Sequence, residues 1–230
     1  MQSVVNVSPG IEQKKVFRIE DIVNSDNDTM VEHSNRAGSG ESEHKIVAIV
    51  RQGDPKLPPS TAQKKTSSSN SRGVECDFPA ELHHVDAATN VLKQFHSHYK
   101  YNICAPQLAA IQTAHTIAKT LNAEHPLLHV EQYLAEWRVE NYKYQTPKEL
   151  QANWKIEVVQ GVKTLPNAKE TKEEAVKRIS SYALDVIGAF SGSMVMVLGP
   201  FAYNVVAEML HTKRHEKPKP FQVEIFQKHC

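Results

Sequence analysis

Residues Val186–Ala207 read VIGAFSGSMVMVLGPFAYNVVA, a stretch without a single charged side chain. About 20 apolar residues are enough to span a bilayer as a helix. Two serines, an asparagine and the pair Gly199–Pro200 interrupt this run, and a helix usually ends before a proline. The stretch therefore predicts one helix that ends near Leu198 and a second that begins after Pro200.

The periodicity upstream of this stretch favours a soluble core over a membrane. Apolar residues recur from Ala175 through Ile179 and Ile187 at helical spacing, whereas Lys177 and Arg178 lie on the opposite face. That pattern is typical of an amphipathic helix that covers the core of a folded domain. A membrane-associated protein that uses residues 186–207 remains the alternative.

Other helical signals occupy most of the chain after Cys76. Helical stripes run through 77–99, through 105–121 and after Pro126, and the capping boxes Thr146–Glu149 and Thr171–Glu174 mark two further helix starts. Strand patterns are short, such as FQVEIF at 221–226. The sequence therefore predicts a mainly α fold, a compact domain of five or six helices over 75–213 with a C-terminal tail at 214–230.

The first 74 residues have a different composition. Phe17 is their only aromatic residue, and the segment GDPKLPPSTAQKKTSSSNSRG is dense in Pro, Ser, Gly and Lys. Such a chain buries too little apolar surface to offset its ordering entropy. We therefore expect a long disordered N-terminal arm over 1–74, in which VFRIEDIV at 16–23 could order on a partner as a helix and KIVAIV at 45–50 as a strand.

Charge within this arm is polarised. Residues 1–44 have a balance of −4, from four basic and eight acidic side chains, and residues 45–74 have a balance of +5, from six basic side chains and Asp54. Flexible cations neutralise phosphates without reading base sequence. A solvated linker is the competing interpretation. The residues predicted to bind nucleic acid are Lys45, Arg51, Lys56, Lys64, Lys65 and Arg72.

Signatures of catalysis and of metal binding are missing from the sequence. The i, i+4 histidine pairs read HPLLH and HTKRH rather than HExxH, and no phosphate-binding glycine loop occurs. Ser191 lacks the glycine spacing of a nucleophile turn. Three cysteines without a CxxC motif favour a reducing compartment over a disulfide framework. We therefore predict no catalytic residue, no metal and no cofactor.

A basic arm, a helical domain and no catalytic signature favour a non-enzymatic, self-associating RNA-binding protein of the viral coat or nucleocapsid type. Its expected partners are single-stranded RNA and further copies of the chain, as a homo-oligomer, with no small-molecule substrate. The expected location is cytoplasmic, or in the virion if the protein is viral. Besides the membrane alternative, an interaction scaffold whose arm carries peptide motifs remains open.

Overall fold

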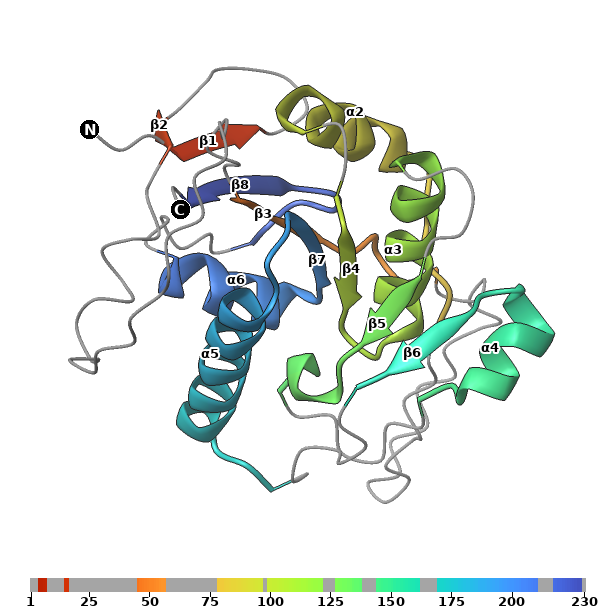
Figure 1. Cartoon of the computed structure of the whole chain (residues 1–230). Helices are drawn as coiled ribbons and strands as arrows, with labels where there is room; N and C mark the ends of the chain where they lie inside the picture. The colour runs from red at the N-terminus through yellow and green to blue at the C-terminus, as the bar shows by residue number, and fades with distance from the viewer. Residues whose placement is uncertain are drawn as a thin grey trace, which may run out of the picture.

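The computed structural model describes residues 4–7, 15–16, 45–56, 78–96, 99–121, 127–137, 144–161, 169–210 and 217–228. These segments form one eight-stranded mixed sheet flanked by helices, with the strand order β2-β1-β8-β3-β7-β4-β5-β6 (Figure 1). The strands are β1 Val4–Val7, β2 Lys15–Val16, β3 Lys45–Arg51, β4 Tyr101–Cys104, β5 Leu128–Val130, β6 Val158–Gln160, β7 Met194–Leu198 and β8 Val223–Lys228. The helices are α2 Val85–Phe95, α3 Leu108–Leu121, the 3-10 turn η1 Gln132–Leu134, α4 Pro147–Trp154, α5 Lys172–Ala189 and α6 Pro200–Met209.

Five neighbouring strands run parallel and end at the same edge of the sheet. β3 pairs with β7, β7 with β4, β4 with β5 and β5 with β6, all in parallel, whereas β8 is antiparallel to β3. We call the shared end of these five strands the carboxyl edge. It is formed by the last strand residues Arg51, Leu198, Cys104, Val130 and Gln160 and by the residues that directly follow them.

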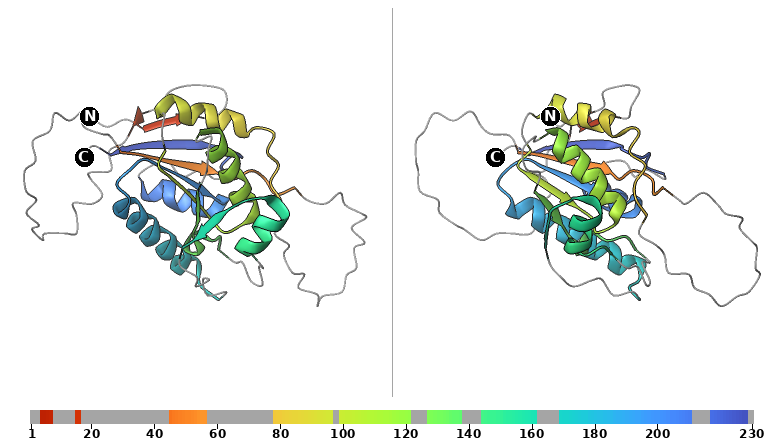
Figure 2. Two further views of the ribbon diagram at one scale, coloured as in Figure 1. Left: turned by 45° about the vertical axis from the view of Figure 1, so that its right-hand side comes forward. Right: turned by 90° about the vertical axis from the view of Figure 1, so that its right-hand side faces the viewer.

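Helices cover both faces of the sheet. α2 packs against α3, and α5 packs against α6, with α3 contacting β4 and β7 while α6 contacts β3 and β7. The turned views show the two helical pairs on opposite sides of the strands (Figure 2). The central strands β3 and β7 are therefore buried on both faces, and every residue from Lys45 to Arg51 and from Met194 to Leu198 is buried.

The prediction of a mainly α fold is wrong, because the domain is α/β. A strand between two helical layers is apolar on both faces and shows no alternation. MVMVL at 194–198 therefore reads like buried helix, although it is β7. The uncharged stretch 186–207 consists of the end of α5, all of β7 and most of α6. Among the described residues no helix has the length and apolarity to cross a membrane.

The structure also divides the chain differently from the predicted arm, domain and tail. β3 lies in the segment assigned to a disordered arm and β8 in the segment assigned to a tail, yet both belong to the same sheet as the helical region. KIVAIV does form a strand, as predicted, but it pairs with β7 and β8 of its own chain. Most of the remaining arm, including VFRIEDIV after Val16, lies outside the described residues.

Several helix predictions are confirmed. α2, α3 and α6 lie where helices were expected, and both capping boxes are present at the starts of α4 and α5. The helix expected after Pro126 is wrong, because that segment forms β5 and η1. The strand expected within FQVEIF is confirmed as β8.

Replacing the N-cap of α5, Thr171→Ala, should lower the free energy of unfolding by about 1 kcal/mol. The Thr171 hydroxyl accepts a hydrogen bond from the Glu174 backbone N–H at 3.2 Å, and the Thr171 N–H donates to the Glu174 carboxylate at 2.7 Å. Urea unfolding measures the change. Thr120→Ala is the matched control, because that exposed hydroxyl only donates to a carbonyl one turn earlier in α3, and an equal loss in both variants would contradict the role of the cap.

Candidate functional site at the carboxyl edge

Polar residues gather where the parallel strands end. Gln52 directly follows β3, Gly199 follows β7, and Gln107 and Gln132 lie shortly after β4 and β5. In open α/β sheets, ligands bind outside the carboxyl ends of the strands, where the strand order reverses. Here β7, the last parallel strand in the sequence, lies between β3 and β4, so the ends of these three strands are the expected position of a site.

Arg51 places a buried positive charge at this edge. The residue is only 8% exposed. Its Nη1 donates to the Gln52 carbonyl oxygen at 2.8 Å and pairs with the Asp54 carboxylate at 2.6 Å. Its Nε is buried and has no protein hydrogen-bond partner. Part of the guanidinium is thus held in place, and one donor remains for another group.

Three glutamines at the same edge also have unpartnered polar atoms. The Oε1 atoms of Gln52 and Gln132 and both side-chain polar atoms of Gln107 are buried without a protein hydrogen-bond partner. Each of these residues is less than 8% exposed. Buried polar atoms in folded proteins almost always have partners, in the protein or from outside it. The carboxyl edge is therefore suited to hydrogen bonds with water or a polar ligand.

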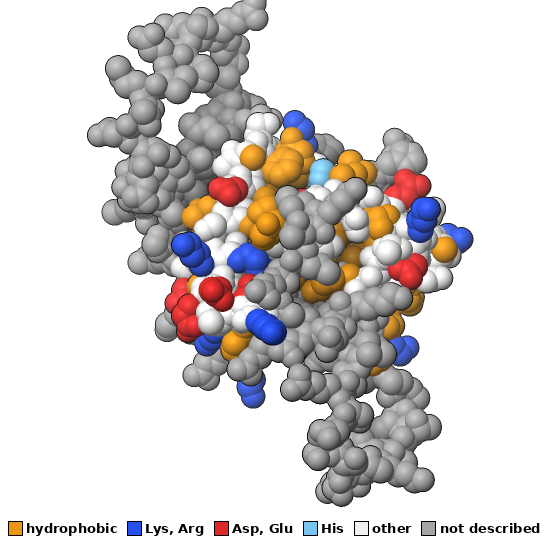
Figure 3. Space-filling model, turned by 90° about the horizontal axis from the view of Figure 1, so that it is seen from below, with side chains coloured by type: hydrophobic (Ala, Val, Ile, Leu, Met, Phe, Trp, Pro, Cys, Tyr) orange, Lys and Arg blue, Asp and Glu red, His pale blue; other side chains and the backbone are white. Residues whose placement is uncertain are grey.

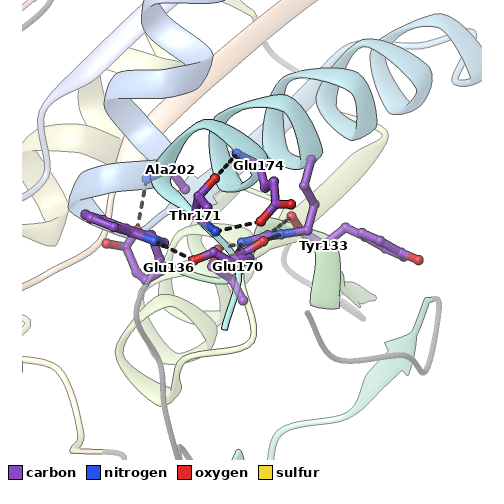
Figure 4. A network of polar contacts seen from close by, with 9 residues as sticks. Tyr133, Glu136, Glu170, Thr171, Glu174 and Ala202 are labelled. Carbon is purple, nitrogen blue, oxygen red and sulfur yellow. Dashed lines mark hydrogen bonds and ion pairs between the residues drawn. The ribbon is translucent and has the colours of Figure 1, made fainter. Parts of the chain in front are cut away.

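A carboxylate occupies the start of α6. The backbone N–H groups of Phe201 and Ala202 donate to the two Glu136 carboxyl oxygens at 3.0 and 2.9 Å, and Figure 4 shows the contact with Ala202. Removal from water raises the pKa of Glu136, and this effect outweighs the lowering by the two N–H donors and by Arg51 and Arg178. Glu136 therefore keeps its proton to a higher pH than an ordinary carboxyl group does.

A buried ion pair holds the segment that carries Glu136. The Arg178 guanidinium of α5 contacts both carboxyl oxygens of Glu170, and both side chains are only 10% exposed. Its Nη1 also donates to the carbonyl oxygens of Tyr133 and Ala135 at 2.6 and 3.2 Å. This network, drawn in Figure 4, fastens the chain just before Glu136 to α5.

A cavity of about 590 Å³ lies beside this network, between η1 and α5. Tyr133 and Tyr182 stack in its wall, with ring centroids 5.2 Å apart. The Tyr182 hydroxyl donates to the Glu131 carboxylate. Burial, that hydrogen bond and the negative charge of Glu131 raise the pKa of Tyr182 well above its usual value. The cavity therefore lies along α5, with an aromatic wall formed by η1 and α5.

The described part of the carboxyl edge offers no obvious nucleophile. Gln52 and Gly199 follow the two central strands, and none of the described residues that end or directly follow the five strands is a histidine. Burial raises the pKa of the Cys104 thiol, and Glu131 raises it further, so the thiol keeps its proton. Within the described segments, no cluster of three or more His, Cys, Asp or Glu residues could hold a metal ion.

The structure separates the residues predicted to bind nucleic acid. Lys45 is 6% exposed at the start of β3, where its Nζ donates to the Ile187 and Phe190 carbonyl oxygens at the end of α5. Arg51 lies at the opposite end of the same strand, and Lys56 is exposed in the loop beyond it. The other three residues, Lys64, Lys65 and Arg72, lie outside the described segments. On the face seen in Figure 3, basic and acidic side chains are interspersed.

Solved structures with the same arrangement of strands and helices are enzymes. The ecdysone phosphate phosphatase of Bombyx mori, solved with tungstate, is similar with a TM-score of 0.57 and 16% identity over 79% of this chain and 88% of that chain. This chain has an α/β fold like that of phosphoglycerate mutase. The mutase of Bacillus anthracis gives a TM-score of 0.51 and 16% identity, over 80% of this chain and 89% of the mutase. A mycobacterial hydrolase also gives 0.51, at 13% identity over 81% and 83% of the two chains. No protein-family model and no curated protein matches the sequence.

These similarities overturn the functional interpretation of the sequence. A non-enzymatic RNA-binding protein of the coat or nucleocapsid type was expected, with single-stranded RNA as its partner and no small-molecule substrate. The neighbours are instead enzymes, namely an ecdysone phosphate phosphatase, a phosphoglycerate mutase and a hydrolase. No nucleic-acid role is therefore retained for the basic residues of the arm.

Sequence reasoning missed most of this site. Arg51 was singled out, but as a phosphate contact for RNA on a flexible arm. Gln52, Gln107, Gln132 and Glu136 were not considered. A usable signal was present, since polar residues follow the short apolar runs KIVAIV, YNIC and LHV within a few positions. Reading those runs as parallel strands would have placed the polar residues at one edge.

Proposed function

We propose that the carboxyl edge binds the phosphate group of a small phosphorylated molecule, with Arg51 as its cationic ligand. The observation that carries this proposal is the buried guanidinium at the end of β3, whose Nε lacks a protein partner. Arginine donates in a planar fork that matches phosphate oxygens. The likeness of the fold to a phosphatase solved with the oxyanion tungstate and to a phosphoglycerate mutase supports the same class of ligand.

The unpartnered side-chain amides of the three glutamines indicate which chemical groups such a ligand should have besides its phosphate. Their unpartnered atoms are mainly carbonyl oxygens, on Gln52, Gln107 and Gln132. Carbonyl oxygens only accept hydrogen bonds, so they cannot bind phosphate oxygens, which are acceptors too. They favour donor groups such as hydroxyls next to the phosphate. The edge therefore supports a phosphomonoester with a polar, hydroxyl-bearing body rather than inorganic phosphate alone.

Hydrolysis of that phosphomonoester is a second candidate activity, favoured by the raised pKa of Glu136. A carboxyl group that keeps its proton can donate it to the oxygen of the leaving alcohol. The described strand ends hold no histidine, and the Cys104 thiol stays protonated. In this scheme a water oxygen attacks phosphorus, the ester P–O bond breaks, and the alcohol oxygen takes the proton of Glu136. The proton that the water loses returns to Glu136, so that the products are the alcohol and inorganic phosphate.

Arg51→Met should weaken phosphate binding by about tenfold or more, because a hydrogen bond to a charged group contributes roughly 1.5–3 kcal/mol. Isothermal titration calorimetry with glycerol phosphate measures the change. Lys56→Met is the matched control, since it removes the same charge from an exposed position in the following loop. Equal affinities for the two variants would contradict the assignment of Arg51.

The hydrolytic activity is tested separately with p-nitrophenyl phosphate, by the absorbance of released p-nitrophenolate. Release that depends on Arg51 would support the second candidate. Binding of glycerol phosphate without any release of p-nitrophenolate would remove hydrolysis and leave the binding proposal intact. Unfolding midpoints of both variants show whether loss of the Asp54 contact has altered the fold.

A further inference from the structure

We propose that Glu136 is an internal anion that occupies the phosphate position at the start of α6, so that an oxyanion binds there only when this carboxyl group moves aside, which loss of its negative charge favours. The inference rests on the proposed function and adds to it a residue that controls affinity. It concerns three elements that meet at the carboxyl edge: the end of β3, the start of α6 and the segment after η1.

The start of α6 has the features of an anion site. Free backbone N–H groups at a helix N-terminus attract negative charge. Pro200 has no N–H, so Phe201 and Ala202 provide the first donors, and both point at Glu136. The first turn of α6 contains no acidic residue of its own. The unpartnered Nε of Arg51 is a second, independent sign that an anion belongs at this edge.

Glycine at position 199 makes room for the carboxyl group. The backbone of Gly199 has φ −68° and ψ 169°, which any residue can adopt. The backbone conformation therefore does not require glycine here. The lack of space does require it, because a Cβ at this position would lie 2.3 Å from Oε1 of Glu136 and 2.6 Å from its carboxyl carbon. Any side chain at position 199 would push the carboxyl group away from the start of α6.

The surrounding charges give the expected dependence on pH. Arg51 from β3 and Arg178 from α5 face Glu136, and Glu170 balances the charge of Arg178. α6 contributes only its backbone N–H groups. Burial nevertheless keeps the Glu136 pKa above its ordinary value of 4.5. Below that pKa the neutral carboxyl group does not repel an oxyanion, and above it the carboxylate does. Oxyanion affinity should therefore fall as the pH rises through the Glu136 pKa.

Sulfate is the suitable probe, because it is a tetrahedral dianion whose own charge stays constant over this pH range. Calorimetric titrations at pH values from about 5 to 8 would compare the parent with Glu136→Gln, Glu136→Ala and Gly199→Ala. The parent should lose affinity as the pH rises. Glu136→Gln and Glu136→Ala should bind sulfate about tenfold more tightly near neutral pH, since each removes the charge that repels sulfate, and a tenfold change corresponds to a shift of one pKa unit. Gly199→Ala should instead bind sulfate more weakly, because its Cβ would lie where the Glu136 carboxyl group lies and would overlap an oxyanion there. The affinity of Glu136→Gln should also be independent of pH.

Gly188→Ala is the matched control for Gly199→Ala, because an added Cβ there meets nothing within 4 Å. It should leave the affinity unchanged. Glu136→Ala removes the whole carboxyl group, so it carries the test if Glu136→Gln does not fold. Sulfate binding that depends on Arg51 but is the same in the parent, Glu136→Gln and Glu136→Ala would overturn this inference alone. Failure of every variant to bind sulfate or glycerol phosphate would overturn the proposed function and the inference together.

Discussion

Ile49→Asp should abolish stable folding of the domain. Ile49 is 0% exposed in the middle of β3, where it lies opposite Met196 of β7 and Glu224 of β8. An aspartate there would place an unpaired charge between two helical layers and beside the buried Glu224 side chain. Such burial costs several kcal/mol, a large part of the roughly 5–15 kcal/mol that stabilises an ordinary domain. Urea unfolding followed by circular dichroism should show no cooperative transition, or one at a much lower midpoint.

The matched control is Val159→Asp, which makes the same kind of substitution in strand β6. Val159 is 40% exposed, so its replacement should change the free energy of unfolding by less than about 1 kcal/mol. The comparison separates burial from strand propensity. If Ile49→Asp had the same unfolding midpoint as the parent, β3 would not be part of the core. The result would then support the unpacked arm that composition predicts for residues 45–51.

The helices could be predicted from the sequence because their signals are local. Thr171 and Glu174 lie within one turn of each other, and both hydrogen bonds of the capping box form between them. The apolar stripe of α5 likewise repeats within the helix, with Ala175, Ile179 and Ala183 all 0% exposed. Neither feature depends on the rest of the fold.

The central strands could not be predicted in the same way, because their environment is set by distant segments. β3 pairs with β7 about 150 residues later in the chain and with β8 beyond it. Its flanking sequence is polar and rich in Pro and Ser, so composition alone assigns it to an arm. Burial on both faces removes the alternation that would mark a strand, and the class of the fold was therefore mistaken.

The site depends on the same distant pairing. Arg51 ends β3, Gln107 follows β4, and Gly199 follows β7. Gln132 and Glu136 both come after β5. Single positions in a sequence do not show that these residues share an edge. The role of Gly199 is also not visible in the sequence, because it follows from the space that Glu136 occupies. A glycine before a proline otherwise indicates only a turn or the end of a helix.

Arg178→Met should lower the free energy of unfolding by about 3–5 kcal/mol, the usual cost of removing one partner from a buried ion pair. The Glu170 side chain, which is only 10% exposed in the ion pair, would be left without its cation. The carbonyl oxygens of Tyr133 and Ala135 would lose their donor as well. Lys177→Met is the matched control, because it removes the same charge from the preceding, exposed position of α5. Urea unfolding should show little change for the control.

The double variant Glu170→Met, Arg178→Met separates the two parts of that loss. Removing both charges eliminates the unpaired carboxylate, so most of the stability should return. The two carbonyl oxygens would still lack their donor, which leaves a deficit of about 1 kcal/mol for each. A double variant no more stable than Arg178→Met would mean that the hydrogen bonds to the chain, rather than the ion pair, dominate. In that case Arg178 would act mainly by fastening residues 133–135 to α5, and through them by positioning Glu136 at the start of α6.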